Sequence, residues 1–318
     1  MCLKYISDKT SYFMNTFFDV IKTKLYDSIY IFRKQGIFYD PDSILKNSSV
    51  AENKLKVMSY NIDNHAFHKL KYSTPDINRA VDIINYLQSI EFDIICLQGV
   101  WGETMKQEIY DAFISENYYI ALPNYKKNFV LGENSGLMLI SKYPIITQTF
   151  LPFKNSKVMC SFINKGVQYC HITVPVKNSE NVIVEYPLNI ANTHLQSSLT
   201  NISGYLDFSK TAKNQLQYII DECPFNNCIL AGDINLTKSQ MDRFIKDQKN
   251  KQLTYFGINE SNTHKNEKER LNYFLCIAKT PYTMTHSTEN TTASEIDLSD
   301  HYPIISNVSF FSNINNID

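Results

Sequence analysis

From Leu55 onward, strand-like runs alternate with helical patterns, and this alternation limits most strongly how the chain can fold. Apolar, strand-forming runs predict strands at 55–60, 93–98, 136–141, 146–174 (as hairpins turning at 164–166), 182–193, 228–231, 273–277 and 304–310. Apolar residues spaced by three or four predict helices near 77–90, 104–115 and 205–221. Many strands with helices between them favour an α/β fold, a four-layer α/β/β/α sandwich in which outer helices cover two packed mixed β-sheets.

Composition sets bounds on the class of protein. Of 318 residues, 43% are hydrophobic and 13% aromatic, so the chain can bury a substantial core. With 31 basic and 32 acidic residues, its net charge of −1 gives no global field that attracts nucleic acid, although a local basic groove stays open as an alternative. No apolar run is long enough to span a membrane and no secretory signal is evident, so we expect a cytoplasmic or peripheral-membrane protein. We also expect a monomer.

The first 53 residues form a unit of their own. One apolar stripe at helical spacing predicts a helix there, made by Met14, Phe18, Ile21, Leu25, Ile29 and Phe32. Packing of this helix on the main domain is the plainer interpretation, and its basic residues leave binding to a membrane surface or a partner protein open. The predicted organisation is a helical extension at 1–53, a main domain at 54–312 and a tail at 313–318.

Seven cysteines, an odd number, are more typical of reduced thiols than of a disulfide framework. Two pairs stay open as disulfides. Cys160 and Cys170 could face each other across a hairpin, whereas Cys223 and Cys228 bracket a turn that contains proline. The sequence does not decide the redox state of either pair.

Polar side chains gather where the predicted strands end or begin. Four segments far apart in the chain place Asn, Asp or His there, namely Asn61, Asn192 with His194, Asp233 with Asn235, and Asp300 with His301. Taken singly, such a residue is more often a turn former or a structural group. Taken together, the oxygen ligands suit Mg²⁺ or Mn²⁺, and two histidines suit general-base and transition-state roles. The reaction class indicated is metal-assisted hydrolysis of a phosphoester.

A set of motifs stands in one order along residues 55–310: VMSYNIDN, FDIICLQ, NSGLMLISKYPI, NTHLQ, LAGDIN, RLNYFL and SDHYPI. In this order they resemble the endonuclease/exonuclease/phosphatase superfamily, the fold of deoxyribonuclease I, abasic-site endonucleases and neutral sphingomyelinases. Two further segments, NKGVQYCHI and THLQSS, are most similar to the sphingomyelinase branch. The resemblance implies a divalent-metal-dependent phosphodiesterase with a phosphodiester substrate.

The resemblance also implies catalytic roles, residue by residue. His194 would bind an oxygen of the scissile phosphate. Asp233 would orient or deprotonate the attacking water, and Asn235 beside it would stabilise the phosphorane-like state. His301 would be the second general base or a phosphate-stabilising group. Lys165, at the predicted hairpin turn, is a weaker candidate for a phosphate contact, because a turn lysine is more often simply solvated.

At the metal side the resemblance makes Asn61 a ligand or its hydrogen-bonded support, and gives Asp300 a supporting place. Two positions depart from the family pattern. The family has its principal carboxylate ligand, a glutamate, where this chain has Gly99, and an aspartate where this chain has Asn272. Neutral Asn272 would orient the catalytic histidine but support its charged form poorly. Glu103, about one helical turn from Gly99, could replace the lost carboxylate, although glutamates at helix starts are common for capping alone.

Two classes of function follow from these residues. The surviving site favours an active enzyme that uses Mg²⁺ or Mn²⁺, either sphingomyelinase-like or an endonuclease. The changes at Gly99 and Asn272 favour a weak or inactive family member that binds a lipid, a nucleic acid or a protein. The near-zero charge and the sphingomyelinase-like hairpin favour a membrane lipid headgroup over nucleic acid. If the two changes cause low activity, Gly99→Glu with Asn272→Asp should restore it, provided that Gly99 does not have a positive φ.

Overall fold

The structure is a computed structural model, and it describes most of the chain from Lys54 to Ser309. The described residues are 54–64, 76–123, 134–157, 160, 163–177, 181–201, 204–248, 252–256, 262–265, 269–279, 286–289 and 298–309. The predicted N-terminal helix, with its alternative roles, and the predicted tail lie outside the described residues.

The described strands form two six-stranded sheets and one small hairpin. The first sheet has the order β13 (His286–Glu289), β14 (Ile304–Ser309), β1 (Lys54–Asn64), β2 (Ile94–Val100), β4 (Met138–Ser141) and β3 (Tyr119–Ala121). The second sheet has the order β11 (Leu253–Tyr255), β12 (Asn272–Ala278), β10 (Asn227–Asp233), β7 (Ile183–His194), β6 (Gly166–Lys177) and β5 (Ile145–Pro152). The hairpin consists of β8 (Leu199–Asn201) and β9 (Gly204–Leu206).

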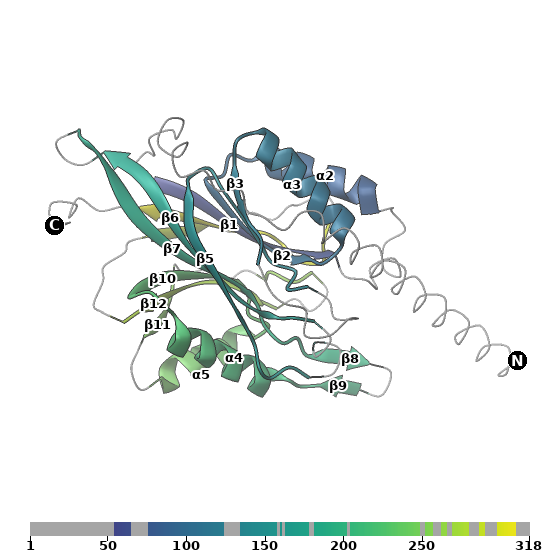
Figure 1. Ribbon diagram of the computed structural model, residues 1–318. Helices are drawn as coiled ribbons and strands as arrows, with labels where there is room; N and C mark the ends of the chain where they lie inside the picture. The colour runs from purple at the N-terminus through teal and green to yellow at the C-terminus, as the bar shows by residue number, and fades with distance from the viewer. Residues whose placement is uncertain are drawn as a thin grey trace, which may run out of the picture.

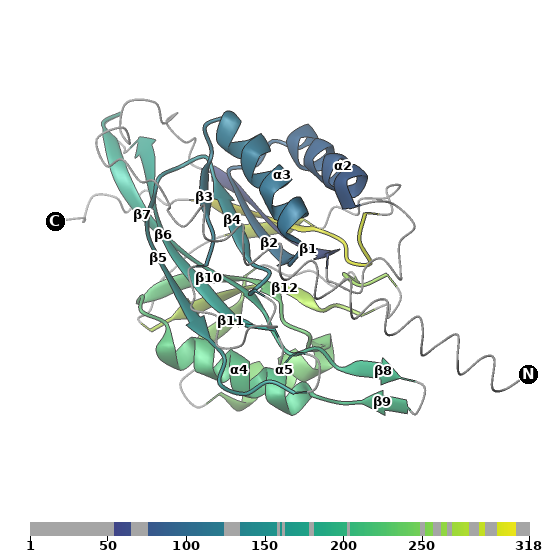
Figure 2. The same cartoon turned by 45° about the vertical axis from the view of Figure 1, so that its right-hand side comes forward.

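Helices cover the outer face of each sheet. Figure 1 shows α2 (Asp76–Ser89) and α3 (Glu103–Ser115) on one side, with α4 (Ser209–Glu222) and α5 (Lys238–Asp247) on the opposite side. The same layers are seen in the turned view of Figure 2. The predicted four-layer α/β/β/α sandwich with two packed mixed sheets is confirmed.

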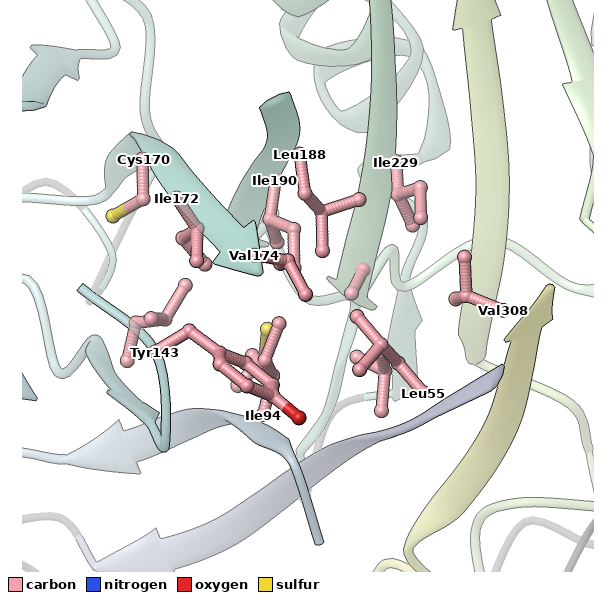
Figure 3. Close-up of a cluster of buried hydrophobic side chains, with 14 of the residues drawn as sticks. Leu55, Ile94, Tyr143, Cys170, Ile172, Val174, Leu188, Ile190, Ile229 and Val308 are labelled. Atoms are coloured by element: carbon pink, nitrogen blue, oxygen red, sulfur yellow. The ribbon is translucent and has the colours of Figure 1, made fainter. Parts of the chain in front are cut away.

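Three apolar clusters hold these layers together. The central cluster lies between the two sheets, where residues such as Leu55 and Ile94 face Val174 and Ile190 across the sandwich (Figure 3). A second cluster lies between the first sheet and helices α2 and α3, and a third between the second sheet and helices α4 and α5. Each helix presents one apolar stripe to its sheet, as in α4, whose buried residues are Ala212, Gln215, Leu216, Ile219 and Ile220.

Two pairs of parallel strands determine where the candidate site residues can meet. β1 and β2 run parallel in the first sheet, and β7 and β10 run parallel in the second. Because parallel neighbours end at the same edge, the carboxyl ends of β7 and β10 lie side by side, as do those of β1 and β2. The β8–β9 hairpin starts soon after His194 and projects from the side where β7 ends (Figure 2).

Most of the longer elements lie where the sequence predicts them, and most of the shorter ones were missed. The predicted helix at 205–221 begins only at Ser209, because residues 204–206 pair as β9. The strands β3, β8, β9, β11 and β13 have three or four residues, too few for a readable period. Helix α5 has a mostly polar sequence in which Met241 is the buried residue, so its apolar stripe is too thin to detect.

The six cysteines among the described residues are free and buried. Cys170 lies in β6 opposite Gln148, and Cys160 lies in the connection between β5 and β6, where its Sγ is 3.7 Å from Ser197 Oγ. Cys223 and Cys228 contact each other as thiols, and the hydrogen bond from Cys228 is the main cause that lowers the pKa of Cys223 to about 7. Neither pair forms a disulfide.

Within the part of the chain that is described, no helix is long and apolar enough to cross a membrane.

We expect residues 54–309 to fold without the N-terminal extension. The three apolar clusters are built from residues between Leu55 and Val308, and β1, which lies inside the first sheet, begins at Lys54. A truncated protein that starts at Asn53 should remain soluble and melt in one cooperative transition, which circular dichroism can record. Aggregation, or a melt without a transition, would show that the extension belongs to the core.

Candidate functional site

The site is assembled by three neighbouring strands of the second sheet. His194 at the end of β7 stands in register with Asp233 at the end of β10, and Asp233 stands in register with Asn272 at the start of β12. All three side chains are buried. The sheet alone therefore places a histidine, a carboxylate and an amide next to one another, as the sequence predicts.

Asp233 lies at the centre of this arrangement. Its Oδ2 accepts a hydrogen bond from Asn61 Nδ2 at 2.8 Å, so that β1 of the first sheet is joined to β10 of the second. The same oxygen lies 3.5 Å from His194 Nε2 and 3.7 Å from His301 Nε2. The structure thus brings two histidines and an amide from three chain-distant segments to a single carboxylate oxygen on a fourth.

Asn235 and Lys165 support the chain around His194. Asn235 has a φ of 54°, its backbone N–H donates to Asp233 Oδ1 (3.2 Å) and its Nδ2 donates to the carbonyl of Leu195 (3.3 Å). Lys165 Nζ donates to the same carbonyl at 2.6 Å. The Lys165 side chain is buried, so it is not a solvated turn lysine, and its hydrogen bond is made to the backbone beside His194.

The ring of His194 is also held from the other sheet. Its ring centroid lies 5.4 Å from that of Trp101, with an angle of 36° between the planes. The backbone carbonyl of Trp101 accepts a hydrogen bond from Asn134 Nδ2 (3.0 Å), and a Cβ at Gly136 would stand 2.4 Å from the indole nitrogen. Gly136 therefore allows the indole to lie close to the backbone beneath it.

The segment that carries Asp300 and His301 is fastened to the end of β1. Ser299 Oγ donates to the carbonyl of Asn61 (2.7 Å) and accepts from the backbone N–H of His301 (3.1 Å). Arg79 of α2, almost fully buried, donates to the carbonyls of Ile62 and Leu298 and so joins the same two segments. Ser299 and Arg79 are positioning residues that no sequence pattern indicated.

His301 has a hydrogen-bond partner on one side of its ring and two carboxylates on the other. Its Nδ1 donates to the amide oxygen of Asn272 at 2.8 Å, which leaves Nε2 facing Asp233 and Asp300. The predicted orienting role of Asn272 has the required geometry. Its Nδ2, also buried, makes no hydrogen bond within the described residues.

A third histidine, His264, lies beside this group and was not predicted. Its Nε2 is 3.4 Å from Asp300 Oδ2, and its ring meets that of His301 edge to face with centroids 4.7 Å apart. His264 is not at the end of a long strand, and it precedes a charged stretch that reads as a surface loop. No pattern in the sequence distinguishes it.

The backbone conformation and the close packing at position 99 both require glycine. It lies in β2 with a φ of 73°, and the register of β1 against β2 shifts between Asn61 and Asn64. A Cβ at Gly99 would stand 2.5 Å from Asn61 Oδ1 and 2.8 Å from the backbone nitrogen of Asp63. Glutamate cannot therefore replace Gly99 without moving the end of β1.

Glu103 is the first residue of α3, but its side chain lies outside the described residues, so its predicted replacement of the carboxylate stays a prediction.

Two other strand-end residues are structural. Gln98, which could have been a catalytic or metal-binding residue at the tip of β2, is fully buried and donates to Ser59, to the carbonyl of Cys96 and to Asn192 Oδ1. Asn192 in turn donates to the carbonyls of Leu97 and Met138 across the sandwich. The two amides join the sheets beneath the site, because buried amides must find partners wherever the packing provides them.

Comparison with known proteins identifies the family of this chain. A profile of the endonuclease/exonuclease/phosphatase family matches residues 58–299. The chain belongs to this family. His301 lies just beyond the matched residues, although His194, Asp233 and Asn272 lie within them.

One curated protein and two solved structures illustrate what the chain is similar to. A sphingomyelinase of Dictyostelium discoideum is 29% identical over 178 residues, which is 46% of this chain and 37% of that relative. A beta toxin variant from Staphylococcus aureus with bound magnesium ions has a TM-score of 0.62 at 18% identity, covering 81% of this chain and 100% of the other. A humanized D. rerio TDP2 has a TM-score of 0.61 at 15% identity, with coverages of 81% and 100%. At such identities the structural likeness shows the fold alone.

The corner formed by Asn61 and Gly99 does not fit a magnesium ion held by oxygen ligands. Gly99 offers no carboxylate, and the place of its Cβ is taken by Asn61 and Asp63. The amide of Asn61 is itself engaged, since Oδ1 accepts from the backbone of Asp63 (3.0 Å) while Nδ2 donates to Asp233. Mg²⁺ demands several oxygen ligands in octahedral geometry, and the side chains described at this corner do not supply them.

Proposed function

We propose that the protein is a sphingomyelinase-like phosphodiesterase that attacks the phosphodiester of a choline-phosphate lipid. The convergence of Asn61, His194 and His301 on Asp233 Oδ2 carries this proposal. A carboxylate between two imidazoles is what water-mediated phosphoester cleavage needs, because one group must take a proton from water while others stabilise charge on phosphate oxygens.

Each residue has one task in this proposal. Asp233 orients and deprotonates the attacking water, since hydrogen bonds from Asn61 Nδ2 and the Asn235 backbone fix its two oxygens. His194 and His301 approach the same oxygen from β7 and from the segment before β14, so a phosphate oxygen placed there would meet an imidazole Nε2 on either side. Lys165 acts on the position of His194, through the Leu195 carbonyl, and contacts no phosphate.

We further propose that Mg²⁺ alone supports little hydrolysis. Removal of a principal carboxylate ligand or of an orienting group typically lowers a rate by on the order of 10²-fold or more. Both changes are present here, at Gly99 and at Asn272, and the backbone around Gly99 leaves no room for the missing carboxylate.

A lipid headgroup is favoured over nucleic acid by the sphingomyelinase among the relatives and by the net charge of −1. Contact with a membrane would have to occur at the edge that carries the site. The exposed apolar pair Val182 and Ile183 does not serve this purpose. It stands at the opposite end of β7 from His194, about 35 Å away at roughly 3.3 Å per residue.

A second candidate function is binding of a phosphodiester lipid, a nucleic acid or a protein without turnover. The backbone at Gly99 favours it, because the end of β1 occupies the space in which the side chain of a metal ligand would lie. The same residues around Asp233 would then form a phosphate-binding pocket. An endonuclease is the remaining alternative, and D. rerio TDP2, which has the same fold, has a structure in complex with a single-strand DNA product.

Substrate class can be tested by sedimentation. We expect the protein to associate with vesicles of sphingomyelin and phosphatidylcholine on the order of tenfold more tightly than with duplex or single-stranded DNA at physiological salt, because its charge offers little counterion release. Vesicles of a glycolipid without phosphate are the control. Tight binding to DNA that weakens steeply with salt would instead support the endonuclease.

A further inference from the structure

We propose that His264, Asp300 and His301 bind a transition-metal ion of the Zn²⁺ type. The ligand atoms of the three side chains all lie within 4.8 Å of one another. The ion would lie beside Asp233. A catalytic role for the ion therefore rests on the proposed function. The test of the metal site reads metal binding without any substrate.

Backbone pairing brings the three residues together. His264 bridges to both Glu269 and His301, and the Lys265 N–H donates to the carbonyl of Asp300 (2.8 Å). The N–H of Tyr302 donates to the carbonyl of Thr263 at 2.8 Å. The segments 262–265 and 300–302 therefore form a short two-stranded pairing that holds both histidines at fixed positions, independently of any contact between their rings.

The separations between the donor atoms suit an ion. His264 Nε2 lies 3.4 Å from Asp300 Oδ2, and His301 Nε2 lies 3.7 Å from Asp300 Oδ1. Tetrahedral ligands at about 2.1 Å from Zn²⁺ are separated by about 3.4 Å. A charge-assisted hydrogen bond would draw nitrogen and oxygen to about 2.8 Å. Each imidazole Nε2 thus lies about as far from its nearer Asp300 oxygen, Oδ2 for His264 and Oδ1 for His301, as two ligands of one ion lie from each other.

The kind of donor selects the kind of ion. Two imidazole nitrogens and one carboxylate oxygen suit Zn²⁺, Co²⁺ or Fe²⁺, whereas Mg²⁺ and Ca²⁺ prefer oxygen alone. Three protein ligands leave a fourth position for water or a phosphate oxygen. The side chains of His264, Asp300 and His301 are 10%, 14% and 8% exposed, so solvent reaches the cluster only narrowly.

Asn272 completes the arrangement. A metal-bound histidine usually gives its other ring N–H to a neutral or anionic acceptor, which fixes the tautomer. The amide oxygen of Asn272 accepts from His301 Nδ1 at 2.8 Å, and Nε2 faces Asp300. A histidine ligates a metal ion in its neutral form, and with the proton on Nδ1 the lone pair that would bind the ion is on Nε2. Asn272, a departure from the family pattern, thereby suits a nitrogen-ligated ion.

The test is a titration of the full-length, metal-stripped protein with Co²⁺, followed by visible absorption. We expect one equivalent to bind with the d–d bands of a nitrogen and oxygen site, and Zn²⁺ to displace it. His264→Ala and the milder His264→Gln should each weaken binding by on the order of 100-fold. His171→Ala, at a histidine in β6 whose Nδ1 contacts Asn189 Oδ1, is the matched control and should leave binding unchanged.

Several results would overturn the proposal. They are the absence of Co²⁺ binding below millimolar concentrations, unchanged binding in both His264 variants, or an intense thiolate-to-cobalt band, which would place the ion on the cysteines. Thermal melts of the variants separate a lost ligand from a lost fold, because a folded His264→Gln that has lost Co²⁺ supports the site. Hydrolysis is assayed separately. Hydrolysis by a protein that fails to bind Co²⁺ would overturn the metal site alone, and Co²⁺ binding without hydrolysis would overturn the proposed function alone.

Discussion

Gly99→Glu is expected to lower the stability of the protein by about 3 kcal/mol or more, and not to give it a magnesium ligand. A residue with a side chain at a φ of 73° costs roughly 1–2 kcal/mol relative to glycine. The Cβ contacts at 2.5 Å with Asn61 Oδ1 and 2.8 Å with Asp63 N then force the end of β1 to move. In a domain of this size the melting temperature should fall by about 10 °C, which differential scanning calorimetry measures.

Gly102→Ala is the matched control for this prediction. Gly102 lies three positions along the chain at the start of α3, with a φ of −68° that any residue adopts. Its replacement should leave the melting temperature nearly unchanged. A Gly99→Glu protein that melts like the wild type and binds Mg²⁺ would contradict our account of β1. The sequence-based expectation that Gly99→Glu with Asn272→Asp restores activity required that Gly99 not have a positive φ. That condition is not met, because φ is positive.

Asp233→Asn is expected to reduce phosphodiester hydrolysis by at least about 100-fold, because an amide cannot take a proton from water. The replacement has the same shape, so one of its two polar atoms can still meet Asn61 or the Asn235 backbone and the fold should persist. Release of p-nitrophenol from bis(p-nitrophenyl) phosphate gives the rate. Asp247→Asn, at an exposed carboxylate at the end of α5, is the control and should retain the full rate. Rates within threefold of each other for all three proteins would remove Asp233 from the chemistry.

The fold could be predicted because its longer helices and strands carry a hydrophobic pattern over many residues. The alternation of strand-like runs and helical stripes was readable over stretches such as Asp76–Ser89 and Ile183–His194, and the layers then follow from burying one face of each element. Most elements of three or four residues, such as β3 and β11, were not predicted. Tertiary pairing forms them, and their local sequence carries no period.

The candidate site was predictable only where its residues end long strands. Asp233 and His194 follow buried runs, and their register in the parallel sheet brings them together. His264 and Arg79 were missed because their places depend on contacts between segments far apart in the chain, as with the bonds from Arg79 to Leu298. Asn192 was misleading for the opposite reason, since a polar residue at a strand end also serves to satisfy buried amides between two sheets.

The most direct test of the proposed function is phosphorus NMR of sphingomyelin vesicles incubated with the wild-type protein and with Asp233→Asn. The wild type should convert the lipid resonance into that of free phosphocholine, with ceramide recovered from the membrane, and Asp233→Asn should not. The assay is run with Mg²⁺ alone, which should support little conversion, and in parallel with Zn²⁺ or Co²⁺. Vesicles that bind the wild-type protein but release no phosphocholine with any of these ions would contradict a phosphodiesterase and establish a binding protein in its place.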